Sequence, residues 1–459
     1  MTLTRRQFAG VLAAAGFAPA AEPLNLLILT NDQHRADGLG CMGNPVVKTP
    51  AADRLAAEGV LFESHYVQCP QCVPSRAAMH TGRYPHTNRT PTNLYRLSDR
   101  EETLAMILNR NGYRTATTGE LPFAPTRFLG GFQEVLPGGE KMPPEHELAR
   151  KRHAEDLKRD FQAVAAPWPE ELDETALFAR RAIDFLRASR ERPFYLHVNF
   201  RRPHHPFDPP HPFDRMYEDA QFPASHQREG EMKNKPPAQQ KALENSVGFD
   251  LRTMTARDLH RIKSYYYAMI SLNDQYIGRI LEELRRLDLD RRTVVVFNAD
   301  HGEMLGDHGL LFKGGYFYDE VVHAPLILRA PGLPAGKRVA DLVETVDLLP
   351  TLLELVGLAK SDRVQGRSLL PVIAGTDRRA RAVHSEFPGT KMIRTREWKL
   401  VHYLHAPYGE LYDLKEDPHE LYNRWDDPAC ARAKSEMLAR LADWLVDTED
   451  PMLIPLKAG

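Results

Sequence analysis

The sequence predicts an α/β fold: a mostly parallel sheet flanked by helices, with a small α+β subdomain at the C-terminal end. Two observations support this. Short apolar segments alternate with segments of helical spacing, and three apolar segments, 24–29, 194–200 and 293–297, each end in a cluster of polar residues. Ligands of such folds bind beyond the carboxyl ends of the strands, so we expect the three clusters to meet on one face.

The polar clusters contain side chains suited to catalysis or ligand binding. In chain order they are 30–33 (Thr-Asn-Asp-Gln), 201–204 (Arg-Arg-Pro-His) and 298–301 (Asn-Ala-Asp-His). A further apolar segment, 324–328, follows the third cluster and predicts another strand.

Helices are predicted between these strands. Residues 49–59 have a proline near the start and a glycine at the end, and 175–188 and 262–287 carry apolar residues at helical spacing. The segments 134–168 and 209–256 are polar and rich in proline. We expect them to be long loops that either wall a pocket or form plain surface insertions.

Beyond residue 370 the pattern changes to antiparallel strands. Alternating segments at 392–403 and 410–414 predict strands, and 434–446 predicts a closing amphipathic helix. These elements are the basis for the small C-terminal subdomain.

The composition is that of an ordinary globular protein. Lys and Arg total 60 against 62 Asp and Glu, which leaves a formal net charge of -2. Nucleic acid and anionic membrane surfaces attract strongly basic proteins, so neither is an expected partner.

The N-terminus has the features of an export signal. Arg5 and Arg6 precede a short apolar run from Ala9 to Ala18, and small residues suited to cleavage follow. The paired arginines resemble a twin-arginine signal. The run is too short to span a bilayer, so we expect a periplasmic or extracellular protein and not an integral membrane protein.

Four cysteines are too few for a disulfide scaffold in 459 residues. Cys69 and Cys72 form a C-x-x-C pair, which is also the pattern of a redox site or half a zinc site. No second pair completes a zinc site, and the chain is not a small thioredoxin-like unit. Cys69 is therefore interpreted as a core residue.

The segment from Cys72 to Arg76 spells C-x-P-x-R, and Thr81-Gly82-Arg83 follows it. This pattern resembles the maturation signature of the type I sulfatases, in the alkaline phosphatase superfamily. The resemblance implies an alkaline-phosphatase-like fold and a formylglycine-generating enzyme that oxidises Cys72 to formylglycine. One hydroxyl of the hydrated aldehyde would attack sulfur and expel the alcohol. The second would then lose its proton and expel sulfate, which regenerates the aldehyde, and Arg76 would hold the hydrate.

The resemblance also implies one divalent metal ion. Asp300-His301, within the Asp-His-Gly segment, matches two ligands of the superfamily, and Asp32 a third. The commonest sulfatase pattern has aspartate where Asn31 stands. The pair Asp32-Gln33 resembles the phosphonate monoester hydrolase branch, so Gln33 is favoured as the fourth ligand, with Asn31 in reserve. Hard oxygen ligands suit Ca²⁺, the expected ion, and also Mg²⁺ or Mn²⁺.

The remaining candidates surround the reacting group. Lys313 would hold the substrate oxyanion, and His204, in a Pro-His segment, would protonate the leaving oxygen. His205 is expected to point another way and either to support the site or to be merely exposed. Asn93 matches an active-site asparagine of choline sulfatases and phosphonate hydrolases, although Asn88 competes for that assignment.

One motif departs from the sulfatase pattern. Many sulfatases have Gly-Lys-x-His after a Gly-Tyr-x-Thr turn, whereas this chain has Glu120 and Pro122 in place of the lysine and histidine. Phosphonate hydrolases also lack that pair. The expectation is that Glu120 lies at the substrate, paired with an arginine or turned away.

These observations predict a hydrolase of sulfate esters, acting on sulfated sugars or small molecules and releasing inorganic sulfate. Residues 1–21 are interpreted as the signal peptide, 22–370 as the catalytic domain and 371–459 as the C-terminal subdomain. A phosphonate or phosphate ester hydrolase is the alternative, and a catalytically silent anion-binding homologue is a third.

Overall fold

The computed structural model of the protein describes residues 23–121, 123, 129–136, 144–189, 191–377 and 382–449. The predicted signal peptide and Pro122 lie outside these residues. Among the helices described, none is both long and apolar enough to span a membrane.

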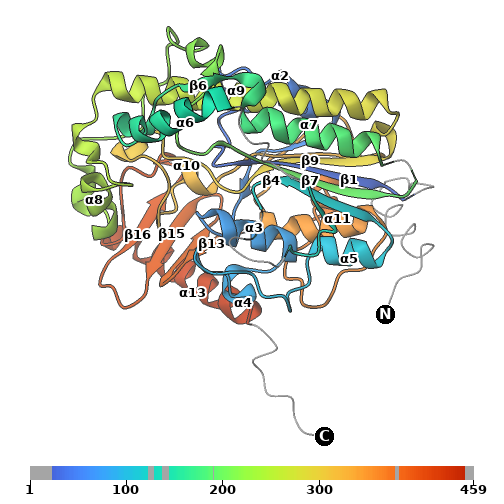
Figure 1. The fold of residues 1–459 in the computed structure, drawn as a ribbon. Helices are drawn as coiled ribbons and strands as arrows, with labels where there is room; N and C mark the ends of the chain where they lie inside the picture. The colour runs from blue at the N-terminus through green and yellow to red at the C-terminus, as the bar shows by residue number, and fades with distance from the viewer. Residues whose placement is uncertain are drawn as a thin grey trace, which may run out of the picture.

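An eight-stranded mixed sheet forms the centre of the fold (Figure 1). In spatial order its strands are β11 (Lys337–Val339), β2 (Val60–Phe62), β10 (Leu326–Arg329), β9 (Thr293–Ala299), β1 (Asn25–Asp32), β7 (Phe194–Pro203), β4 (Arg114–Gly119) and β5 (Glu134–Val135). Only β10 runs antiparallel to its neighbours. The three predicted strands with polar ends are the central neighbours β9, β1 and β7, which confirms a mostly parallel sheet.

Helices cover both faces of this sheet (Figure 1). On one face lie α2 (Pro50–Glu58), α7 (Glu174–Arg187) and α9 (Ala256–Arg286); on the other lie α3 (Cys72–Thr81), α5 (Leu104–Arg110) and α11 (Leu348–Leu355). Because successive side chains of a strand point to opposite faces, β1 contributes to two cores. Leu27 and Leu29 pack with the first set of helices, and Leu26 and Ile28 with the second.

The small C-terminal sheet is an antiparallel meander of β13 (Val383–Phe387), β14 (Thr390–Arg394), β15 (Trp398–Tyr403) and β16 (Gly409–Asp413). The closing helix α13 (Ala431–Asp447) covers one face through Met437, Leu441 and Trp444. The fold class predicted from the sequence is therefore confirmed, including the small subdomain.

The two long polar segments were wrongly predicted to be loops throughout. The first contains α6 (Pro144–Asp156), and the second contains α8 (Pro237–Glu244). Helix α9 also begins at Ala256, six residues before the predicted start, with Thr255 and Asp258 forming a capping box. The remaining short elements are β3 (His65–Tyr66) paired with β12 (Val343–Glu344), β6 (Ala166–Pro169) paired with β8 (Pro210–His211), and helices α4 (Pro85–Asn88), α10 (Asp319–Val322) and α12 (Leu370–Ile373).

Candidate active site

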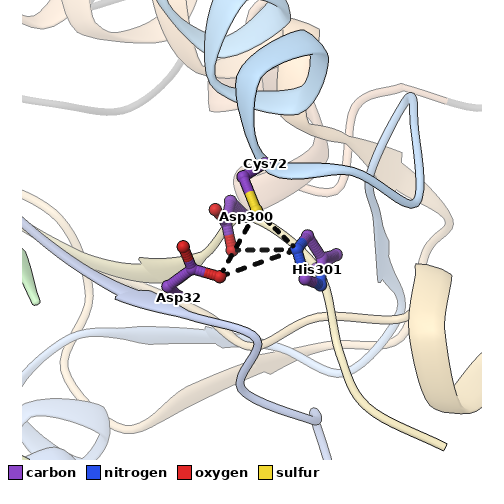
Figure 2. Close-up of side chains that lie close together, drawn as sticks. All are labelled: Asp32, Cys72, Asp300 and His301. Atoms are coloured by element: carbon purple, nitrogen blue, oxygen red, sulfur yellow. Dashed lines mark hydrogen bonds and ion pairs between the residues drawn. The ribbon is translucent and has the colours of Figure 1, made fainter. Parts of the chain in front are cut away.

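Four buried side chains converge at the carboxyl ends of β1 and β9 (Figure 2). Asp32 ends β1, Asp300 and His301 follow β9, and Cys72 is the first residue of α3. One ligand atom from each lies within 4.8 Å of the others. Cys72 Sγ is 3.2 Å from His301 Nε2 and 3.6 Å from Asp32 Oδ1. The structure thus brings together the predicted nucleophile and three predicted metal ligands.

Cys72 is positioned by the N-terminus of α3, whose ten residues are all buried. Asn93 Oδ1 accepts a hydrogen bond from the backbone N–H of Val73 at 3.0 Å, one of the N–H groups that a helix leaves unpaired at its start. Asn88 instead bonds Arg83 and Thr90 within its own turn. The asparagine preferred from the sequence, Asn93, therefore lies next to Cys72.

None of the four cysteines, all within the described residues, forms a disulfide. Cys69 is fully buried among core residues, as interpreted from the sequence. Burial, and secondarily the Asp32 carboxylate, raise the pKa of the Cys72 thiol to about 12.

Arg76 joins three carboxylates from different elements. Its Nη2 donates to Asp32 and, at 3.0 Å, to Glu120, and its Nε donates to Asp300 at 2.8 Å. Arg76, Asp32 and Asp300 are each at most 3% exposed. Such a buried network requires every charge to be compensated, which fixes the guanidinium behind Cys72.

The donor set of this cluster fits a divalent metal ion. Burial, with the nearby Asp300 carboxylate, raises the pKa of Asp32 well above its usual value, as expected for two anions that need more positive charge. His301 Nδ1 bonds the Gly302 carbonyl at 2.9 Å, which turns Nε2 towards the carboxylates. Oxygen-rich ligands with one imidazole are compatible with Ca²⁺, Mg²⁺ or Mn²⁺.

Gln33 faces this cluster and Asn31 does not. Gln33 Oε1 accepts from Lys313 Nζ at 2.8 Å, and the Gln33 backbone N–H donates to Asp300 Oδ1 at 3.1 Å. Both polar atoms of the Asn31 side chain are used elsewhere, with His34 and Asn273. The geometry therefore favours Gln33 over Asn31 as the fourth ligand.

Lys313 supplies the cation nearest to the reacting group. Its Nζ lies 3.2 Å from Cys72 Sγ and 4.0 Å from Asp32 Oδ1. Burial alone would lower the pKa of Lys313, but Cys72, Asp32 and Asp300 outweigh it and raise the pKa. The ammonium group is therefore charged at neutral pH.

His204 and His205 both lie beside the cluster. Their rings stack with centroids 4.1 Å apart, so the expectation that His205 points another way is wrong. His205 Nδ1 is 3.2 Å from Gln33 Nε2, and His204 Nδ1 contacts the His205 carbonyl. Both residues follow the end of β7, where the alternation of a strand no longer applies. Burial, with Lys313 nearby, lowers the pKa of both rings well below the usual value.

Comparison with known proteins places this geometry in a family. The Sulfatase family model matches residues 24–358, and the model of the N-sulphoglucosamine sulphohydrolase C-terminal region matches residues 306–447. The chain belongs to the sulfatase family. It is therefore a sulfuric ester hydrolase of the alkaline phosphatase superfamily.

Three similar proteins illustrate the breadth of this match. The uncharacterized sulfatase YidJ of Escherichia coli K12 is 30% identical, over 93% of this chain and 88% of that protein. The arylsulfatase of Clostridium perfringens is 30% identical, over 87% and 89%. The crystal structure of the phosphonate monoester hydrolase of Agrobacterium radiobacter superposes with a TM-score of 0.82 at 30% identity, covering 94% of this chain and 97% of that one.

Two residues of this sulfatase site had no role in the sequence prediction. Glu303 accepts from Gln33 Nε2 and from the Leu305 and Phe312 backbones, which orients Gln33. Arg201 Nε lies 3.7 Å from Glu120 Oε1. Arg201 belongs to the second polar cluster, so its place after a strand was the available signal. Glu303 follows the Asp-His-Gly segment, and sequence gives no sign of its partner.

A cavity of about 1590 Å³ opens beside the sulfatase site and is bordered by Arg201 and His204. Its walls come mainly from the two segments predicted to be loops, including Glu147, Arg150, Trp168 and Phe249. The prediction that these segments wall a pocket agrees with this cavity, although they do so partly as helices.

Proposed function

We propose that this sulfatase hydrolyses sulfate esters by a metal-dependent reaction in which residue 72 acts as formylglycine. The observation that carries the proposal is the position of Cys72 Sγ. It lies 3.2 Å from both Lys313 Nζ and His301 Nε2, at the N-terminus of α3, with the Asp32 and Asp300 carboxylates alongside. The predicted nucleophile and the groups that can stabilise an anion are therefore buried side by side.

The chain's own groups would bind and orient the sulfate group. The positive end of the α3 dipole and the Lys313 ammonium favour an anion beside residue 72. Arg76, which is bonded to Asp32 and Asp300, would hold the hydrate of residue 72. When formed, formylglycine supplies a hydroxyl nucleophile as its hydrate, and a cation held by Asp32, Gln33, Asp300 and His301 supplies further positive charge.

His204 is the proposed donor of a proton to the leaving oxygen. Its Nδ1 contacts the His205 carbonyl, so Nε2 is the nitrogen available to the substrate. The ring is neutral in the free protein because burial, then Lys313, lower its pKa. A bound sulfate ester brings negative charge next to His204 and favours the imidazolium that can act as an acid.

The mass of the peptide containing residue 72 tests the proposal. Protein produced together with a formylglycine-generating enzyme should yield a peptide that has lost the thiol sulfur and gained an aldehyde oxygen. An unmodified cysteine, from a host that converts a control sulfatase, contradicts the formylglycine mechanism.

Phosphonate ester hydrolysis is a second candidate activity. It is favoured by the place of Gln33 beside Lys313 and by the similarity to the Agrobacterium phosphonate monoester hydrolase. The ratio of kcat/KM for 4-nitrophenyl sulfate to that for the 4-nitrophenyl ester of phenylphosphonate separates the two. A ratio well above one supports the sulfatase proposal, and a ratio below one supports the alternative.

The cavity supports a sulfated sugar as the substrate. Its volume of about 1590 Å³ exceeds the roughly 300–1,000 Å³ that holds a drug-sized molecule. Its lining combines Trp168 with charged groups such as Arg150 and Arg201, a mixture that suits polar saccharide rings. Sulfated oligosaccharides should therefore have lower KM values than small aryl sulfates.

We also propose export by the twin-arginine route, because such substrates cross the membrane already folded. Modification of Cys72 by the formylglycine-generating enzyme and metal loading could then precede export. Replacing Arg5 and Arg6 by lysine should retain the protein in the cytoplasm, and unchanged export would contradict the proposed route.

A further inference from the structure

A second group of potential metal ligands lies outside the catalytic cluster. His226 comes from the irregular chain between η4 (Phe213–Arg215) and η5 (Glu231–Asn234), Asp307 begins the 3-10 helix η8 (Asp307–Gly309), and Glu320 lies in α10. One ligand atom from each lies within 4.8 Å of the other two. Three separate parts of the chain therefore meet at this point.

The distances within this group suit a cation bound between the side chains better than direct hydrogen bonds. His226 Nδ1 is 3.6 Å from Asp307 Oδ1 and 3.9 Å from Glu320 Oε1. Both separations are too long for hydrogen bonds. Two ligand atoms in a tetrahedral Zn²⁺ site lie about 3.3 to 3.6 Å apart, so these two pairs need a shift of at most a few tenths of an ångström to reach binding distance.

His308 adds an imidazole prepared for metal binding. Its side chain is fully buried, and its Nδ1 is bonded to the Glu231 carboxylate. Its Nε2 has no hydrogen-bond partner among the described residues and lies 3.9 Å from Glu320 Oε2. A carboxylate on one ring nitrogen with the other nitrogen free is the usual arrangement of a metal-bound histidine.

Glu320, like His308, has a buried side-chain atom without a hydrogen-bond partner among the described residues. Its side chain is 8% exposed, and its Oε2 likewise lacks a hydrogen bond within the described structure. Each Glu320 oxygen faces a different histidine, His226 or His308. A buried carboxylate oxygen without a partner is costly, and a cation between the two rings would remove that cost.

We propose that His226, His308, Asp307 and Glu320 form a second metal site, for a borderline transition-metal cation such as Zn²⁺. Imidazole and carboxylate ligands together favour such cations over Ca²⁺ or Mg²⁺. Asp307 is already oriented by Arg35 Nη1 at 2.6 Å and by the His226 N–H at 2.6 Å. The half-exposed ring of His226, with 38% of its side chain accessible, provides an entry path from solvent.

The site would hold an irregular segment against the catalytic loop. In the sequence, Asp307 and His308 lie between His301 and Lys313, and these last two residues belong to the catalytic cluster. Besides its ring, His226 is linked to this loop through its backbone. The His308 N–H donates to the His226 carbonyl at 2.7 Å, and the His226 N–H donates to Asp307 Oδ1 at 2.6 Å. A cation there fixes the loop that presents Lys313.

Zinc binding in excess Ca²⁺ tests the inference, since Ca²⁺ competes for the oxygen-rich catalytic cluster. Protein without a polyhistidine tag is stripped with chelator and dialysed against Zn²⁺, and bound zinc is measured by mass spectrometry of the metals. Co²⁺ in place of Zn²⁺ reports the ligands through its visible absorption. We expect one equivalent per chain, and at least about tenfold weaker binding in His226→Ala and Glu320→Gln.

Two control variants locate the metal. Asp300→Asn damages the catalytic cluster and should keep the zinc, and His211→Ala removes an exposed histidine and should also keep it. Glu320→Gln preserves shape, so it decides the matter if His226→Ala fails to fold. No zinc bound to the wild type overturns the proposal, as does zinc lost from Asp300→Asn but retained by Glu320→Gln. Residue 72 is formylglycine or alanine in this measurement, because an unmodified Cys72 thiolate beside Asp32, Asp300 and His301 would itself bind zinc.

Discussion

The guanidinium of Arg76 donates to the Glu120 carboxylate at 3.0 Å, while its other nitrogen bonds Asp300. Glu120 stands where many sulfatases have a lysine, and this pairing explains how an acid is tolerated there. Burial would raise the pKa of Glu120, but Arg76, a hydrogen bond with Asp32 and Arg201 together outweigh it, and the pKa is lowered. The carboxylate is therefore ionised at neutral pH and adds negative charge beside Arg76.

Glu120→Gln should strengthen the binding of anionic substrates. The variant keeps an oxygen that can accept from Arg76 but removes one negative charge. Because the side chain is 36% exposed, solvent screens much of the effect, and we expect KM to fall about threefold to tenfold with kcat little changed. Initial rates with a sulfate ester at low ionic strength measure this. Unchanged KM would show that Glu120 does not sense the substrate.

Cys72→Ala should abolish turnover while the protein still folds. The variant removes the group that is converted to formylglycine and leaves the helix start intact. Cys69→Ala is a matched control three residues away, because Cys69 is a buried core residue. We expect that control to lose about 1 kcal/mol of stability and to keep its activity. Activity of Cys72→Ala above that of metal-stripped protein would disprove the nucleophile assignment.

His204→Ala should slow esters with poor leaving groups far more than esters with good ones. A proton donor matters most when the departing oxygen is basic, and general acid catalysis typically contributes about 10²- to 10⁴-fold. His205→Ala is the matched variant, since the His205 ring bonds Gln33 and, unlike that of His204, does not itself line the cavity. It should affect both kinds of ester equally. Rates across a series of aryl sulfates make the comparison, and parallel losses in His204→Ala remove its acid role.

Sequence alone predicted the strands whose ends form the site, because each is a buried apolar run followed by polar residues. The sequence predicted that the ends of these strands meet on one face, and the structure shows that β9, β1 and β7 are neighbours. Two kinds of feature escaped. Helix α6 is polar around its whole circumference, so no apolar stripe marks it. The stacked rings of His204 and His205 lie beyond a strand end, where the direction of side chains depends on tertiary contacts.

The place of Cys72 beside Asp32 and His301 was predictable only through the family resemblance. The contacts join residues far apart in the chain, and no local pattern encodes them. The partner of Glu120 was likewise open, since Arg76 and Arg201 are both near. The sequence did not decide whether the Glu120 carboxylate pairs with an arginine or points away. In the structure it pairs with Arg76.

Lys313→Met should reduce kcat/KM by about 10²- to 10³-fold. The methionine preserves length and removes the ammonium that lies 3.2 Å from Cys72 Sγ, a loss similar to that of one oxyanion donor. Lys313→Arg should recover part of the rate, because it restores charge in a different shape. Steady-state kinetics on modified protein measure both. Equal activity of Lys313→Met and wild type would exclude a role in holding the sulfate group.

Removal of the catalytic metal should abolish activity. The residue beside Asp32 that serves as the fourth ligand should determine the affinity for the ion. Gln33→Ala should weaken cation binding about 10- to 100-fold, because its amide oxygen faces the cluster. The neighbouring variant Asn31→Ala should lower Tm, since Asn31 bonds His34 and Asn273 in the core, but leave Kd unchanged. Titration of chelated protein with Ca²⁺, Mg²⁺ and Mn²⁺, by calorimetry and by recovered activity, gives both values. A weaker Kd in Asn31→Ala than in Gln33→Ala would reverse the assignment of the fourth ligand.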